Sequence, residues 1–237
     1  MFKCFHCGEC CVNPATQINI TVGDLVRLGK DTGLSVADLF KKHAGIVPFQ
    51  TEKDFIYEMD LGLHIPCEFR KDLKCTNYQA RPMNCRLFPL WILVEKEDEA
   101  DFILTELNKC KGQRLTGQSK IKTTKYVNMI KALLLNESKI SDEIVKALGL
   151  SKKVDIRELS GYDEFVVGAK KKVDAVEGKG LKRKVAEREK VKFIKNYFSE
   201  RYVGVGKKIE DELTKRDLLK RIMPLHEVQF AENVLLR

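Results

Sequence analysis

The chain has 237 residues, and 43% of them are apolar, the proportion expected of a globular protein. It contains no run of 18 or more apolar residues and no apolar segment at its N-terminus, so we expect neither a transmembrane helix nor a secretion signal. These features predict a cytoplasmic protein. In a reducing compartment, its eight cysteines are expected to be metal ligands, with disulfides as the alternative that a hyperthermophilic source would favour.

The charge is distributed unevenly along the chain. Residues 1–112 carry 14 Lys/Arg and 16 Asp/Glu, a net charge of −2, whereas residues 113–237 carry 29 and 18, a net charge of +11. This asymmetry predicts two parts: a cysteine-rich domain over residues 1–115 and a basic region over residues 116–237. An acidic partner or nucleic acid is one interpretation of the basic region, and a Lys/Glu-rich solvated surface is the other.

The first cysteines form a tight cluster. Cys4, Cys7 and Cys10 follow the spacing C-x-x-C-x-x-C, and Cys11 comes directly after them. Two residues between cysteines let one turn wrap a metal or one face of a cluster, and the spacing matches the first three ligands of a bacterial ferredoxin-type sequence. Because neighbouring side chains tend to point apart, we expect that one of Cys10 and Cys11 either reaches a second metal or is not a ligand.

Short helices and strands are expected between this cluster and the next. The helix start signals are Thr21 and Ser35, and the stop signals are Gly33 and Gly45. Residues 46–65 alternate in the manner of strands, most clearly over residues 55–59. His43 is expected to be an exposed residue at a helix end rather than a ligand. The N-terminal half is therefore predicted to be of the α+β class.

A second group of cysteines follows at Cys67, Cys75 and Cys85. The segment between the first two is expected to be a hairpin-like excursion. Arg81 and Arg86 flank Cys85, where guanidinium groups would lower thiol pKa values and offset the charge of a thiolate site. The structural alternative is that these arginines pair with Glu68 or Asp72, and both roles are compatible. Residues 91–94 and 102–105 read as a strand hairpin that leads to Cys110, which closes the site or is a buried apolar residue.

The rest of the chain has the apolar spacing of helices and contains no further cysteine. Separate helices are predicted over 124–135 and 141–148, over 163–176, over 181–202 and over 207–222. The glycines at 178 and 180 mark a linker or hinge. We therefore expect a mainly α-helical C-terminal region.

The two cysteine groups together resemble a known family. The patterns C-x-x-C-x-x-C-C at residues 4–11 and C-x7-C-x2-Y-x2-R-P-x2-C-R-x-F-P at residues 67–89 are similar to the YkgJ-type cysteine-cluster family, described as zinc- or iron-chelating. Tyr78, Arg81 and Arg86 fall in register with that motif, and the resemblance implies that they line the metal or cluster site. The ligands that it implies are Cys4, Cys7, Cys10, Cys11, Cys67, Cys75, Cys85 and Cys110.

The resemblance leaves three functional hypotheses. The first is an iron–sulfur or zinc protein, with a redox role in the iron case; the C-x-x-C-x-x-C spacing and the flanking arginines favour iron–sulfur. The second is a protein lysine N-methyltransferase-like enzyme, because flagellin lysine N-methylases are similar over this domain. The third is a zinc-stabilised module whose basic helices bind nucleic acid or an acidic partner. No phosphate-binding, dinucleotide-binding or hydrolase motif is present, and no catalytic residue is assigned.

Overall fold

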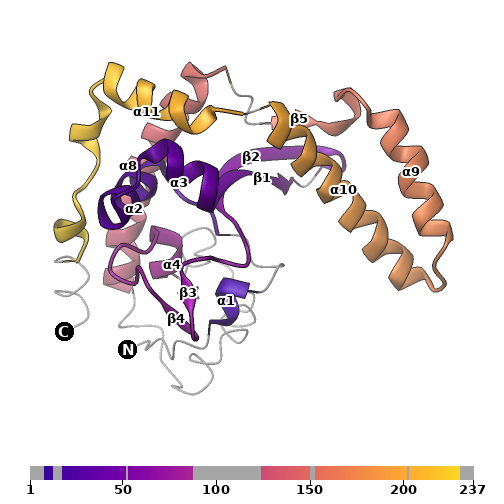
Figure 1. Ribbon diagram of the computed structural model, residues 1–237, viewed down its shortest axis with the longest axis horizontal. Helices are drawn as coiled ribbons and strands as arrows, with labels where there is room; N and C mark the ends of the chain where they lie inside the picture. Colours follow the sequence, from indigo (N-terminus) through magenta and orange to yellow (C-terminus); the bar gives the residue numbers. More distant parts are fainter. Residues whose placement is uncertain are drawn as a thin grey trace.

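The computed structural model describes residues 8–12, 18–51, 53–87, 124–149, 153–201 and 203–229. Over these ranges the chain is of the α+β class, as predicted: a three-stranded antiparallel sheet in the order β1–β2–β5 is surrounded by helices (Figure 1). A second, two-stranded sheet is formed by β3 and β4. No helix in the described ranges is long and apolar enough to cross a membrane.

Two capped helices follow the short N-terminal helix α1 (Glu9–Val12). The first, α2 (Val22–Thr32), begins at Thr21, whose hydroxyl accepts a hydrogen bond from the Asp24 N–H while the Asp24 carboxylate accepts one from the Thr21 N–H. This reciprocal capping satisfies two backbone donors that a helix start leaves without partners. Gly33 ends the helix with a φ of 72°, which glycine adopts without strain. The second helix, α3 (Val36–His43), begins at Ser35. The sequence signals placed both helix starts and the end of α2 correctly, whereas α3 ends at His43 and Gly45 lies in the strand that follows.

The sheet joins residues that are distant in sequence. Strand β1 (Ala44–Gln50) pairs with β2 (Ile56–Leu63), with Ala44 opposite Leu63. On the other side of β2, the short strand β5 (Lys153–Asp155) pairs with Ile56–Glu58. The sequence analysis missed β5, because three residues are too few to show a period-2 pattern.

The C-terminal region is helical, as predicted. Its elements are α8 (Thr124–Ala147), the 3-10 turn η1 (Ile156–Glu158), α9 (Tyr162–Asp174), α10 (Lys179–Arg201), α11 (Val205–Lys215) and the 3-10 turn η2 (Leu218–Arg221). The prediction of two helices over 124–148 was wrong, since α8 is continuous. No glycine or proline interrupts it, and the Ser141 hydroxyl, read as a second helix start, instead donates to the Glu137 carbonyl within the helix.

The main hydrophobic core contains residues from both halves of the sequence. Leu25 and Leu28 of α2 and Leu39 of α3 pack in the same cluster as Ile140 of α8 and Ile209 of α11. A second cluster joins the outer part of β2 to α10; its buried members are Tyr57, Met59, Ile156, Ile194 and Phe198. The helical region therefore buries the apolar faces of the N-terminal helices and sheet. The division of the chain at residue 115 remains a prediction.

Candidate metal centre

Four segments bring the described cysteines together on one side of the core. Cys10 and Cys11 lie in the short helix α1 (Glu9–Val12). Cys67 precedes β3 (Arg70–Lys71), Cys75 ends β4 (Lys74–Cys75), and Cys85 lies in α4 (Met83–Leu87). Figure 1 shows α1, the β3–β4 hairpin and α4 below the main core. Cys4, Cys7 and Cys110 and the strands expected at 91–94 and 102–105 lie outside the described residues.

Direct contacts join the N-terminal cysteines to the second group. The Cys67 N–H donates to the Cys11 carbonyl at 2.7 Å, which fixes α1 beside the start of the hairpin. The sulfurs of Cys10 and Cys11 are 3.9 Å apart, although neighbouring side chains were expected to point apart. Two sulfurs bound at ~2.3 Å to one tetrahedral zinc would lie roughly 3.8 Å apart. At this distance the adjacent cysteines can bind one ion or belong to two neighbouring centres.

The β3–β4 hairpin sets the positions of Cys67 and Cys75. Its two-residue turn, Asp72-Leu73, has φ angles of 46° and 66°, the left-handed pair that matches the twist of a tight hairpin. The hairpin-like excursion predicted from the sequence is thus confirmed. The Phe69 N–H donates to the Cys67 sulfur and the Asn77 N–H to the Cys75 sulfur, in each case from two residues further along. Hydrogen bonds of this kind stabilise a thiolate and tune the metal that it binds.

The thiols of Cys11, Cys67, Cys75 and Cys85 form one electrostatic group. Burial, with smaller contributions from the charges of Cys11 and Cys75, raises the pKa of Cys67 to about 11 against the hydrogen bond from the Phe69 N–H. Burial also raises the pKa of Cys75, and it raises that of Cys85 well above the ordinary value, with contributions from Cys67, Asp24 and the other two cysteines. Four mutually opposed thiolates need a cation between them, because each ionised sulfur disfavours ionisation of the others.

Cys11 differs from the other three. The hydrogen bond from Cys10 lowers the pKa of Cys11 to about 7, against the effect of burial and with help from the positive charge of Arg70. In metal-free protein at pH 7.5, we expect iodoacetamide to alkylate Cys11 well before Cys67, because the thiolate is the reacting species. Peptide mass spectrometry over time would measure this. Equal labelling of the two thiols from the earliest time points would contradict it.

Arg70 is a site residue that the sequence analysis missed. Its Nε is buried and has no hydrogen-bond acceptor within the described part of the chain. A Cβ at position 8 would come within 2.4 Å of this Nε, so Gly8, with a φ of 70°, allows the guanidinium to lie against the loop that carries Cys10 and Cys11. The sequence signal was available, since Arg70 lies between Cys67 and Cys75, but only the fold shows which arginine faces Cys11.

Arg81 and Arg86, which the motif placed at the site, donate to backbone carbonyl groups between Cys75 and Cys85. Arg81 donates to the Tyr78 carbonyl at 2.7 Å, and its guanidinium lies 3.8 Å from the centre of the Tyr78 ring. Arg86 is buried; its Nε donates to the Arg81 carbonyl at 3.1 Å, and its Nη2 donates to the Gln79 carbonyl. These bonds shape the loop between Cys75 and Cys85. Arg81 lowers the pKa of Cys75, the direction expected of a guanidinium beside a thiol, but burial outweighs this effect and the pKa of Cys75 is raised.

His43 is not the exposed helix end that was expected. Its side chain is 16% exposed, its ring lies 4.5 Å from that of Phe69, and its Nδ1 is 2.9 Å from a carboxylate oxygen of Glu68. Glu68 and Phe69 directly follow Cys67. His43 therefore supports the segment that carries this cysteine.

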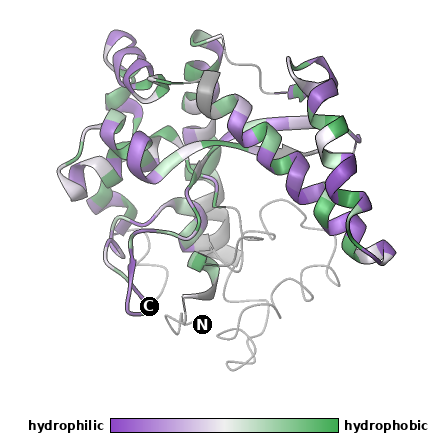
Figure 2. Cartoon of the chain, turned by 45° about the vertical axis from the view of Figure 1, so that its right-hand side comes forward, coloured by the Kyte–Doolittle hydropathy of each residue, from purple (hydrophilic) through white to green (hydrophobic). Residues whose placement is uncertain are grey.

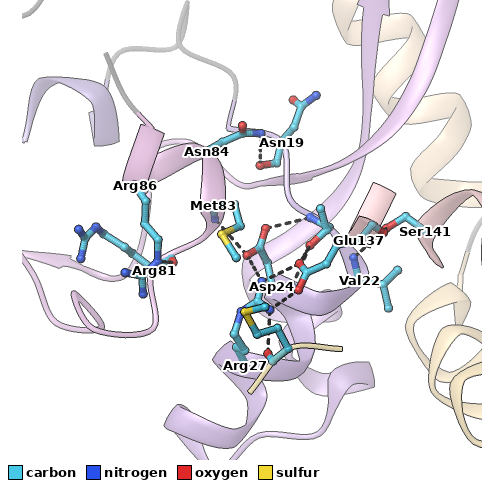
Figure 3. A network of polar contacts seen from close by, with 12 residues as sticks. Asn19, Val22, Asp24, Arg27, Arg81, Met83, Asn84, Arg86, Glu137 and Ser141 are labelled. Carbon is cyan, nitrogen blue, oxygen red and sulfur yellow. Dashed lines mark hydrogen bonds and ion pairs between the residues drawn. The ribbon is translucent and has the colours of Figure 1, made fainter. Parts of the chain in front are cut away.

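A buried ion-pair network holds the helix that carries Cys85 (Figure 3). Asp24 of α2 accepts from the Met83 N–H at 3.0 Å and from Arg27 at 2.7 Å. Arg27 also donates through both terminal nitrogens to Glu137 of α8, and the Thr21 hydroxyl donates to Glu137 at 2.7 Å. The three charged side chains are at most 3% exposed. The start of α4 is therefore hydrogen-bonded to a network in which one of the two carboxylates, that of Glu137, comes from the helical region.

The absence of a side chain at Gly23 leaves room for the Glu137 carboxylate in this network. A Cβ at Gly23 would lie 2.4 Å from the Glu137 carboxylate, so only glycine lets the carboxylate reach the start of α2. Ser141, one turn after Glu137, accepts from the Val22 N–H at 3.0 Å. Helix α8 thus provides partners for the start of α2 at two positions (Figure 3).

The donor chemistry fits a soft metal. The five described cysteines are thiols rather than disulfides, and thiolates select zinc, copper(I) and iron–sulfur clusters over hard cations. Among the described residues, no three His, Cys, Asp or Glu side chains already converge on a single point at ion-binding distance.

The comparison with known families agrees with this chemistry. The family model CxxCxxCC, described as a putative zinc- or iron-chelating domain, matches residues 3–111. The matched residues make up a little under half of the chain. The match includes all eight cysteines, so the resemblance read from the motif is confirmed, and metal binding is the function that the CxxCxxCC domain supports. No solved structure matches the chain.

Proposed function

We propose that this protein binds an iron–sulfur cluster through Cys11, Cys67, Cys75 and Cys85. The observation that carries the proposal is the mutual electrostatic influence of these four thiols, which come from four separate segments of the chain. The C-x-x-C-x-x-C spacing of Cys4, Cys7 and Cys10 and the arginines that flank Cys85 favour an iron–sulfur cluster over zinc. Zinc is the alternative that the domain family equally allows.

The surroundings of the thiols also support a cluster. The potentials of iron–sulfur proteins are set by hydrogen bonds to sulfur, net charge and solvent exposure. Here the N–H groups of Phe69 and Asn77 donate to cysteine sulfurs, and the buried Nε of Arg70 is a further donor beside Cys11. Such a cluster would supply one-electron chemistry. The residues of this chain would hold it, offset its negative charge and limit its contact with water.

The remaining cysteines provide a second set. Cys4, Cys7, Cys10 and Cys110 are also four thiols, so two four-thiolate sites account for every cysteine in the chain. The 3.9 Å between the Cys10 and Cys11 sulfurs would place the two sites next to each other. A reducing, cytoplasmic location suits a protein whose described cysteines are thiols.

The test is an absorption spectrum of protein purified without oxygen, with iron, zinc and acid-labile sulfide counted per chain. We expect a brown protein with iron and sulfide in nearly equal amounts, about four each for a cubane cluster. A colourless protein with one or two zinc ions would overturn the cluster and establish the zinc alternative. Retention of no metal by protein folded without oxygen would overturn both.

Substitution of Arg70 is expected to weaken the centre without unfolding the protein. In the Arg70→Gln variant, loss of the positive charge beside Cys11 should speed metal release to a chelator by about tenfold, the usual effect of removing an outer-shell partner. It should also lower the reduction potential of the cluster, because a cation stabilises the state that has gained an electron.

The matched control is Lys71→Gln, which removes the same charge from an exposed position on the same hairpin. Metal release is measured by absorbance and the potential by redox titration. If both variants change these quantities equally, Arg70 has no specific part in the site.

A further inference from the structure

The tip of the β3–β4 hairpin has a charge arrangement that weakens the fold locally. Lys71 and Lys74 lie directly opposite each other on the two strands, and both are exposed. Like charges at directly opposed positions of an antiparallel pair are destabilising. From Arg70 to Cys75 the chain has three cations and one carboxylate, that of Asp72, and so a net charge of +2, whereas residues 1–112 have a net charge of −2. The hairpin is therefore a local concentration of positive charge.

The turn residue Leu73 adds a second unfavourable feature. Its side chain is 53% exposed, and its φ of 66° lies in the left-handed region that glycine and asparagine adopt most easily. A branched apolar residue at this position gains little from burial and has an unfavourable backbone conformation. The fold alone would favour asparagine or glycine here. Local costs of this kind are characteristic of residues that contact a ligand or a partner.

These features lie beside the candidate metal centre. Leu73 is two residues before Cys75, roughly 7 Å along an extended chain. Val12, which is 37% exposed, directly follows Cys11. The hydrogen bond from the Cys67 N–H to the Cys11 carbonyl holds α1 against the start of the hairpin. Exposed apolar side chains therefore occur next to candidate ligands on two segments that are bonded to each other.

The hairpin is fixed at its base and projects at its tip. The N–H and the hydroxyl of Thr76 both donate to the Phe69 carbonyl, at 2.7 and 3.0 Å. The Phe69 side chain is buried, with its ring beside that of His43. Figures 1 and 2 show the hairpin below the main core, with α11 on the opposite side. The two lysines and Leu73 are thus held in position before a partner binds, which reduces the entropy lost on binding.

We propose that the hairpin tip is the docking site of a small acidic electron-carrier protein, which passes one electron to the cluster held by the neighbouring thiols. This inference rests on the proposed iron–sulfur function. In this step the carrier is oxidised by one electron and the cluster is reduced by one, and no proton or group is transferred. Electron-transfer complexes have small interfaces. An exposed leucine with cations beside it offers such a partner an apolar contact and a complementary charge.

A nucleic acid is a poorer match for this tip. Binding to phosphates gains its strength from many cations, whereas the tip has two lysines and an exposed leucine. A leucine between lysines fits a protein interface, whose core is apolar and whose rim is polar. Lysines on a short strand edge also discourage pairing with other chains, but that role does not require a leucine in the left-handed conformation.

The experiment uses the full-length protein with its cluster, prepared without oxygen, and two acidic carriers as probes, a flavodoxin and a [2Fe–2S] ferredoxin. Fluorescence anisotropy of the labelled carrier measures affinity over a series of KCl concentrations. Stopped-flow absorbance measures reduction of the cluster by the reduced carrier, and dithionite is the comparison reductant that needs no docking site. The two hairpin variants are K71Q/K74Q and Leu73→Asn.

Each hairpin variant has a matched control elsewhere on the surface. K207Q/K208Q removes the same charge from two exposed lysines of α11, and Leu219→Asn changes a leucine of η2 that is 47% exposed. Iron content and melting temperature confirm that each variant is loaded and folded.

We expect K71Q/K74Q to bind the carriers about tenfold more weakly at low salt, with a smaller salt dependence, and Leu73→Asn about fivefold more weakly. Both variants should be at least as stable as the wild type, because each removes a local cost. Their reduction by dithionite should be unchanged. A purely structural role of the hairpin would not combine lower affinity with undiminished stability.

Unchanged affinity in either hairpin variant, or an equal loss in its control, would overturn the proposal. A cluster that dithionite reduces but that neither carrier binds or reduces would overturn the docking site and leave the proposed function intact. Protein without iron would overturn the proposed function and this inference with it. Tighter binding of a DNA duplex than of either carrier, lost in K71Q/K74Q, would replace the carrier with a nucleic-acid partner.

Discussion

Replacing Cys85 with serine is expected to remove the metal bound by the Cys11–Cys67–Cys75–Cys85 group and to destabilise the protein strongly. The other three thiols all influence Cys85, so it lies within their group rather than at its edge. A serine hydroxyl is a poor ligand for a soft metal, and the binding energy of a thiolate site is also folding energy. Loss of even about 4 kcal/mol would lower the melting temperature of a chain of this size by roughly 8–16 °C.

The measurement is metal content per chain together with thermal unfolding under nitrogen. Cys10→Ser is the matched comparison, because it makes the same chemical change next to Cys11 but outside the four-thiol group. We expect Cys10→Ser to keep the iron of that group and Cys85→Ser to lose it. Should Cys85→Ser be insoluble, Cys75→Ser at the end of the hairpin tests the same group. Full metal retention by either would remove that residue from the ligand set.

The sequence predicted those parts of the structure that depend on neighbouring residues. Thr21, Asp24 and Gly33 define a capped helix within a dozen positions, and the structure places α2 between those residues. The hairpin between Cys67 and Cys75 is equally local, since its turn and both of its strands lie within six residues. Cysteine spacing indicated metal chemistry because ligand chemistry is specific to residue type.

The parts that the sequence did not predict depend on contacts between distant segments. Strand β5 is recognisable only because β2 offers it an edge, and Arg70 becomes a site residue only because Gly8 approaches it. Ser141 was predicted to begin a separate helix and Glu137 to lie between two helices, whereas in the fold both complete the start of α2 from more than 110 positions away. No periodicity or spacing in one sequence encodes such pairings.

Replacing Glu137 with alanine is expected to destabilise the fold by about 3–5 kcal/mol, because it leaves the buried Arg27 guanidinium without its main anion. Burial alone would lower the pKa of Arg27, but the bonds from Glu137 and Asp24 outweigh it and raise that pKa well above its ordinary value. The charge of Arg27 is thus retained in the interior by its two carboxylates, and Asp24 cannot replace Glu137 without giving up its bonds to the cap and to Met83. Urea unfolding with the metal removed measures the effect on the protein alone.

Two further variants serve as controls for Glu137→Ala: one removes only the charge of Glu137, and the other removes an exposed carboxylate of the same helix. Glu137→Gln keeps the shape and some of the hydrogen bonds to Arg27 and Thr21, so its loss should be smaller than that of Glu137→Ala. Glu143→Ala removes a carboxylate of the same helix that pairs with Arg221 at the exposed surface, and its midpoint should change little. If the Glu137→Ala protein were as stable as the Glu143→Ala protein, the buried ion pair would contribute nothing to the free energy of unfolding.

The Glu137→Ala substitution should also affect metal binding at the centre. Asp24 holds the Met83 N–H at the start of α4, two residues before Cys85, and Arg27 links Asp24 to Glu137. When Arg27 loses Glu137, its only remaining anion in the network is Asp24, and the competition for that carboxylate should loosen the start of α4. We expect faster metal release to a chelator in Glu137→Ala than in Glu143→Ala under conditions where both remain folded. Equal release rates would confine the network to stabilising the fold, and faster release would show that the helical region helps to position a cysteine of the CxxCxxCC domain.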